Sequence, residues 1–133
     1  MSTVTVPVLL AASVDDIVTP ALLEQVQSFT WVGSEHRYLA MAEDVTHVVG
    51  EPQGGGVQAL ISSLVSPAPT ALVNYDKALA LSFFGRFLTN DPSMEPFLHG
   101  TYARQISQSP FDLYLAGSEI LPELEALLQQ QNP

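Results

Sequence analysis

The chain has 133 residues, 47% of them hydrophobic, which is enough for one domain with a substantial core. Fourteen acidic residues stand against four basic ones, and the formal net charge of −10 argues against nucleic acid or an anionic membrane surface as a partner. Because the sequence contains no cysteine, disulfides, thiolate catalysis and cysteine-based metal sites are excluded.

Neither a membrane span nor a targeting segment is expected. Proline, aspartate or glycine interrupts the apolar runs well before the ~20 residues that a membrane span needs. Residues 1–5 carry no basic charge and no apolar core of the kind found in a signal peptide. We therefore expect the chain as given to be soluble and cytoplasmic, while the location of any longer parent protein stays open.

Residues 1–50 predict a strand, a helix and a second strand. The continuous apolar run Val8–Ala12 is typical of a strand covered on both faces, and Pro7 suits its beginning. Pro20 suits the first turn of a helix, and apolar residues recur at the helical period in 21–29. The second predicted strand is Arg37–Ala42. Strand, helix and strand form one right-handed crossover unit, which makes the two strands parallel.

Residues 51–133 predict a mostly helical region, and the whole chain 1–133 is expected to be a single domain. A flexible glycine-rich loop comes first, followed by a short apolar segment. Three helices are then predicted, the second bent near Gly100. In chain order, the loop is 50–56, the apolar segment 57–65, and the helices 70–88, 94–106 and 119–131.

The sheet predicted in this way is incomplete. Two parallel strands alone make an unstable sheet, and Val8–Ala12 is apolar enough to be central yet has no evident partner on its other side. An exposed apolar edge invites pairing with another chain. We therefore expect that either an N-terminal half is missing or a second chain supplies the edge.

An acidic pair follows the first strand, and a histidine follows the second. Asp15 and Asp16 have two interpretations: a solvated turn that caps the next helix, or a carboxylate that orients an imidazole. His47 on its own is most simply a polar residue. The carboxyl ends of neighbouring parallel strands meet at one edge of a sheet. We therefore predict that Asp15, with Asp16 as the fallback, and His47 form the acid and base of a catalytic triad.

The remaining histidines and the glycine run are ordinary. His36 lies in a turn, His99 lies in a predicted helix, and neither belongs to a set with metal-ligand spacing. The run Gly54–Gly56 lacks the Lys-Ser/Thr of a phosphate-binding loop and is interpreted as a hinge. No metal and no cofactor is therefore expected.

No serine has the surroundings of a triad nucleophile. The string Gly-x-Ser-x-Gly, which marks the nucleophile elbow between a strand and a helix, does not occur in the sequence. Ser34 and Ser118 each follow a glycine but lack a second one two residues later, and Ser62 and Ser63 lie in an apolar segment. Losing the nucleophile costs such an enzyme on the order of 10⁶-fold in rate. We expect the chain to be inactive alone.

Taken in order, these segments resemble the C-terminal part of a bacterial α/β-hydrolase of the dienelactone-hydrolase-like or chlorophyllase-like kind. The resemblance implies an α/β fold, namely a partial hydrolase-type parallel sheet followed by an α-helical C-terminal region. It also implies ester substrates for the complete enzyme, with Asp15 and His47 at triad positions. Val48-Val49 departs from the residues expected after the histidine. The segments that carry the resemblance are 7–13, 15–21, 24–25, 29–31, 37–40, 46–47, 78–84 and 102–107.

Two hypotheses of different classes follow. In the first, the chain is the C-terminal portion of a serine esterase that needs an N-terminal hydrolase half to act. In the second, it is a non-catalytic remnant or a homo-oligomeric interaction module that associates through its open sheet edge.

Overall fold

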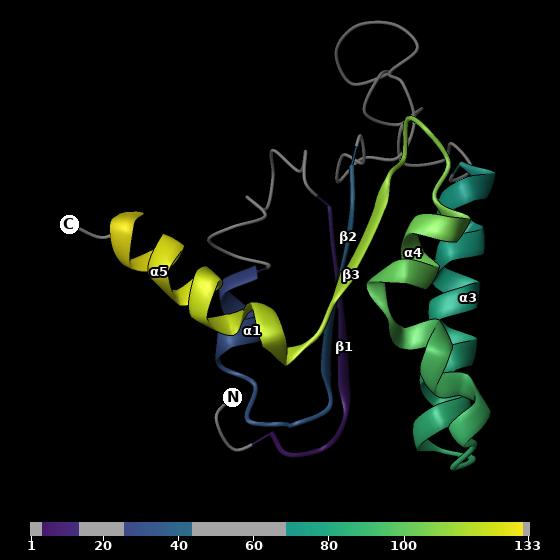
Figure 1. The fold of residues 1–133 in the computed structure, drawn as a ribbon, viewed down its shortest axis with the longest axis horizontal. Coiled ribbons are helices and arrows are strands. Elements are labelled where there is room, and N and C mark those ends of the chain that lie inside the picture. Colours follow the sequence, from purple (N-terminus) through teal and green to yellow (C-terminus); the bar gives the residue numbers. More distant parts are fainter. Residues whose placement is uncertain (1–3, 14–25, 44–68, 132–133) are drawn as a thin grey trace, which may run out of the picture.

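The computed structural model describes residues 4–13, 26–43 and 69–131 (Figure 1). Its sheet has three strands in the order β1-β2-β3. The parallel pair joins β1 (Val8–Ser13) to β2 (Arg37–Ala42), and β2 pairs antiparallel with β3 (Leu113–Ala116). The protein is therefore mixed α/β, with β2 as the central strand of the described sheet.

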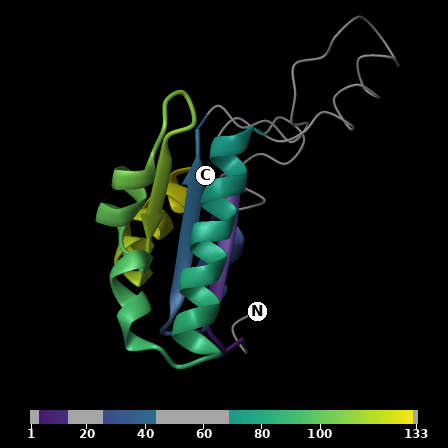
Figure 2. The same ribbon diagram turned by 90° about the vertical axis from the view of Figure 1, so that its right-hand side faces the viewer.

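Helices cover both faces of this sheet (Figures 1 and 2). One face packs against the long helix α3 (Thr70–Phe87), the 3-10 helix η2 (Pro92–Leu98) and the helix α4 (Gly100–Ile106). The other face packs against the short helix α1 (Gln27–Thr30) and the C-terminal helix α5 (Leu121–Gln131). The result is three layers, as expected for a sheet that contains a parallel pair.

The alternation of side chains along β2 creates the two cores. Tyr38 and Ala40 face α3, where they join Tyr75 and Leu79. Leu39 faces the opposite way and is fully buried against Phe29 of α1. Successive side chains of a strand point to opposite faces, so this one apolar strand supports two separate cores.

Both predicted strands of the N-terminal region are confirmed, and their pairing is parallel as expected. β2 has the predicted bounds, and β1 extends one residue beyond the predicted Val8–Ala12. The helix predicted at 21–29 lies partly outside the described residues, and its described part, 26–29, overlaps α1, which ends one residue later than predicted. The predicted loop 50–56 and apolar segment 57–65 lie outside them altogether.

The predicted helices of the C-terminal region are present with shifted ends. α3 lacks only the last residue of the predicted 70–88. The segment 94–106 is two helices rather than one bent helix, because the backbone of His99 is extended between them. The predicted 119–131 begins with the 3-10 helix η3 (Ser118–Ile120) and continues as α5. Within the described ranges, no helix is both long enough and apolar enough to cross a membrane.

The strand β3 was not expected, because no element was predicted for residues 107–118. Its side chains alternate between buried and exposed, with Leu113 and Leu115 in the core and Tyr114 outside. This period of two, placed between Pro110 and Gly117, is the signal of a short strand. Its consequence is topological: β3 occupies one edge of β2, and β1 is an edge strand of the described sheet rather than a central one.

Candidate functional site

The three predicted triad residues, Asp15, Asp16 and His47, lie outside the described residues. The structure does describe the strands that precede them. β1 and β2 are neighbours, and their last residues, Ser13 and Ala42, are partners in the parallel register. The two chain segments that lead to the acid and to the histidine therefore leave the sheet at the same edge. That Asp15 and His47 meet there stays a prediction.

The described residues at this edge hold the end of β2 in place. The backbone N–H of Glu43 donates to the carbonyl of Asp112 at 3.0 Å. Ser107 Oγ accepts from the N–H of Leu113 at 2.7 Å and donates to Asp112 Oδ1 at 3.3 Å. These bonds tie the exit of β2 to the entry of β3. Glu43, the last described residue before His47, is thus held by a backbone hydrogen bond.

A tyrosine and a carboxylate meet at the same edge. The side-chain hydrogen bond to Glu43, followed by the negative charge of that carboxylate, raises the pKa of Tyr114 above its ordinary value. Tyr114 belongs to β3 and lies opposite Met41 of β2 in the antiparallel register. The sequence analysis did not identify this pair, because it depends on the unexpected strand β3.

The two described serines among the nucleophile candidates, Ser34 and Ser118, do not have the geometry of a nucleophile. Ser34 is buried, and its hydroxyl both donates to the carbonyl of His36 (3.3 Å) and accepts from the N–H of His36 (3.1 Å). Ser118 Oγ donates to the carbonyl of Glu35 at 3.2 Å and accepts from Arg37 Nε at 3.3 Å. Both hydroxyls shape turns. Ser62 and Ser63 lie outside the described residues.

Each of the two described histidines has a contact within the fold: His36 packs against a ring, and His99 precedes a helix. The imidazole of His36 lies against the ring of Phe87, with centroids 5.0 Å apart. His99 occupies the position before α4, where its carbonyl accepts from the N–H groups of Tyr102 and Ala103. Over the ranges 4–13, 26–43 and 69–131, no group of three or more His, Cys, Asp or Glu side chains is placed to hold a metal ion.

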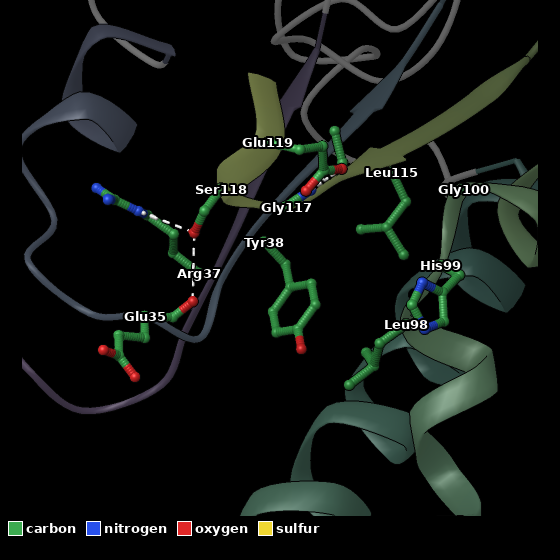
Figure 3. Close-up of a pocket in the computed structure, with 11 residues that line it drawn as sticks. Glu35, Arg37, Tyr38, Leu98, His99, Gly100, Leu115, Gly117, Ser118 and Glu119 are labelled. Atoms are coloured by element: carbon green, nitrogen blue, oxygen red, sulfur yellow. Dashed lines mark hydrogen bonds between the residues drawn. The ribbon is translucent and has the colours of Figure 1, made fainter. Parts of the chain in front are cut away.

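A pocket of about 250 Å³ lies at the other end of the strands, away from the carboxyl ends of β1 and β2 (Figure 3). It is formed where β2 begins, where β3 ends and where α4 begins. In Figure 3, the ring of Tyr38 lies between Glu35 and Arg37 on one side and Leu98 and His99 on the other. The lining residues are Glu35, Arg37, Tyr38, Leu98, His99, Gly100, Leu115, Ala116, Gly117, Ser118 and Glu119.

Several polar groups around this pocket already form hydrogen bonds with other parts of the protein. The guanidinium of Arg37 donates to Ser118 and to the carbonyl of Val32, and it lies over the ring of Phe29 at 5.8 Å. Glu119 Oε1 accepts from the N–H of Gly117 at 2.8 Å. The side chains of Arg37 and Glu119 thus bond to neighbouring turns.

The ring of Tyr38 lies in the pocket, and the pKa of its hydroxyl is raised above the ordinary value. Burial is the main cause that raises its pKa, the negative charge of Glu95 adds to the effect, and the positive charge of Arg86 opposes it. Glu95 and Arg86 are themselves an ion pair, with 2.6 Å between Oε2 and Nε. Tyr38 therefore stays protonated at neutral pH and can donate a hydrogen bond, but it cannot act as a base there.

Comparison of the chain with protein-family models, with curated proteins and with solved structures finds no match in any of the three.

Proposed function

We propose that this chain is the C-terminal portion of an α/β-hydrolase, related to serine esterases of the dienelactone-hydrolase-like kind. The observation that supports the proposal is the parallel β1–β2 pair, whose carboxyl ends are in register at Ser13 and Ala42. Parallel strands that end together are the arrangement from which open α/β sheets present reactive groups. In this proposal, that edge carries Asp15 and His47.

The two residues have separate roles in the proposed reaction. His47 accepts the proton of a serine hydroxyl as that oxygen attacks the ester carbonyl, and then returns the proton to the leaving alkoxide. Asp15 holds the imidazole in the required tautomer and stabilises its protonated form. The serine and its oxyanion hole belong to a partner segment. Since β3 covers one edge of β2, strands that carry the nucleophile would extend the described sheet from β1.

An ester assay tests this proposal. The chain alone should hydrolyse a short nitrophenyl ester no faster than buffer, because it contains no nucleophile elbow. A mixture with an N-terminal hydrolase half that carries Gly-x-Ser-x-Gly should be active, and H47A should reduce that activity by up to about 10⁶-fold. The matched control is H99A, which changes the described histidine before α4 and should leave the rate unchanged. A mixture as slow as buffer, or one that H47A leaves unchanged, contradicts the proposal.

A second function is supported by β1, which is an edge strand of the described sheet. β1 has a neighbour on one side in the described sheet, and Val6, which precedes it, is 64% exposed. An exposed strand edge offers unpaired backbone groups to another chain. In this alternative, the chain is a non-catalytic remnant or a homo-oligomeric interaction module, and its oligomeric state is the measurement that matters.

A further inference from the structure

The outer side of α3 carries an exposed apolar seam, here defined as Leu81, Phe84 and Leu88. Their side chains are 69%, 53% and 75% exposed. Spacings of three and four residues place them on one face of the helix, and all three line a groove of about 710 Å³. Figure 2 looks onto α3 from this side of the molecule. Contiguous apolar residues of this size on a surface mark an interaction site more often than scattered ones do.

The two charged residues of the groove have opposite signs and lie at opposite ends of the seam. Lys77 is one helical turn before Leu81, and Asp91 follows the carboxyl end of α3. The N–H of Asp91 donates to the carbonyl of Gly85 at 3.1 Å, which holds this residue beside the helix end. Hydrogen bonds from Ser93 lower the pKa of Asp91, so its carboxylate is charged at neutral pH. The groove lining is thus electrically neutral on a chain whose net charge is −10.

We propose that a second copy of this chain docks on the seam, with the two α3 helices antiparallel about a two-fold axis. Such an interface is self-complementary, because every contact from one residue of the first copy to another residue of the second copy is repeated with the two copies exchanged. With the axis midway between Lys77 and Leu88, Leu88 of one copy lies opposite Lys77 of the other, and Leu81 lies opposite Phe84. Lys77 and Leu88 are about 16 Å apart along each helix. The carboxylate of Asp91 beside Leu88 then faces that lysine, and the pairing occurs twice.

Charge also favours this face over the rest of the surface. Two chains of charge −10 repel each other, and a neutral strip is where they can approach at the least cost. Each copy contributes three exposed apolar side chains, which is a small contact, and we expect a reversible dimer with a Kd of roughly micromolar order. This inference is independent of the hydrolase proposal. It shares with the second function a second copy of this chain as the partner, but it places the contact on α3 instead of on the edge of β1.

Sedimentation equilibrium over a range of concentrations tests it. Wild type should form a dimer, and F84E should weaken it by about 100-fold or more, because each glutamate would face the apolar Leu81 of the other copy and the two carboxylates would lie close together beside the axis. The matched control is F97E, which alters a partly exposed phenylalanine outside the groove and should leave the dimer intact. Circular dichroism establishes that each variant is folded.

A charge exchange tests the register. K77D alone should weaken the dimer by about tenfold, and adding D91K should restore it to within about threefold of wild type. Asp91→Lys also removes the hydrogen bonds to Ser93, but the loss of a cap cannot by itself restore binding. A wild-type chain that stays monomeric at about 1 mM overturns the inference. So does a double variant that is not rescued. A dimer that survives F84E places the interface elsewhere; it overturns this inference and leaves the oligomeric function standing.

Discussion

Replacing Phe29 with alanine is expected to lower the free energy of unfolding by about 3–5 kcal/mol. The Phe29 side chain is fully buried between α1 and the sheet, where it packs with Val26 and Leu39. Its ring also lies under the guanidinium of Arg37. Truncation leaves a cavity that a short helix resting on a sheet cannot fill. For a small domain with about 5–15 kcal/mol of total stability, the loss is a large fraction.

The control for Phe29 is Phe97→Ala. Phe97 is 38% exposed, and the centroid of its ring lies 5.0 Å from that of Tyr102. Its loss should cost about 1 kcal/mol, close to the value of one aromatic pair. Urea unfolding followed by the fluorescence of Trp31, the single tryptophan, measures both variants. If Phe29→Ala costs no more than Phe97→Ala, the layer formed by α1 and α5 is not a packed part of the fold.

Replacing Gly100 with alanine is expected to destabilise the chain by about 1–3 kcal/mol. A Cβ at Gly100 would lie 2.8 Å from the carbonyl oxygen of Leu115 in β3. Backbone on both sides cannot rotate away, so α4 would have to move off the sheet. As the first residue of α4, Gly100 also gains little from the higher helix propensity of alanine.

Gly85→Ala is the matched control for this contact and should have the opposite sign. Its Cβ would meet the Cγ of Met94 at 2.9 Å, nearly the same distance, but that partner is a flexible side chain. Gly85 lies inside α3, where alanine gains up to about 1 kcal/mol. Thermal unfolding of both variants at the same low concentration compares them. A Gly100→Ala variant as stable as wild type would show that α4 does not approach β3 so closely.

The N-terminal sheet could be predicted because its signals are local. A continuous apolar run predicts β1, a second one predicts β2, and the helical pattern between them requires a crossover and therefore parallel strands. None of these predictions depends on contacts between residues that are far apart in the sequence. The ends of α3 were predictable for the same reason, since its apolar spacing and flanking residues determine them.

The strand β3 and the pocket depend instead on contacts between distant parts of the chain. β3 has only four residues, and its pairing of Leu39 with Ala116 cannot be seen in either segment alone. The bond from Arg37 to Ser118 joins residues 81 positions apart. The pocket, the Tyr114–Glu43 pair and the edge position of β1 all follow from β3, so one missed strand concealed all three.

The central claim is that Asp15 and His47 meet at the carboxyl edge of the parallel strands, and a histidine titration by NMR tests it most directly. The imidazole signals of the chain's three histidines can be assigned with H36Q and H99Q. A neighbouring carboxylate favours the protonated imidazole, so D15N should lower the titration midpoint of His47 by about one pH unit, while D16N should leave it in place. A shift with D16N alone would make Asp16 the acid. A His47 midpoint that neither substitution moves would contradict the claim.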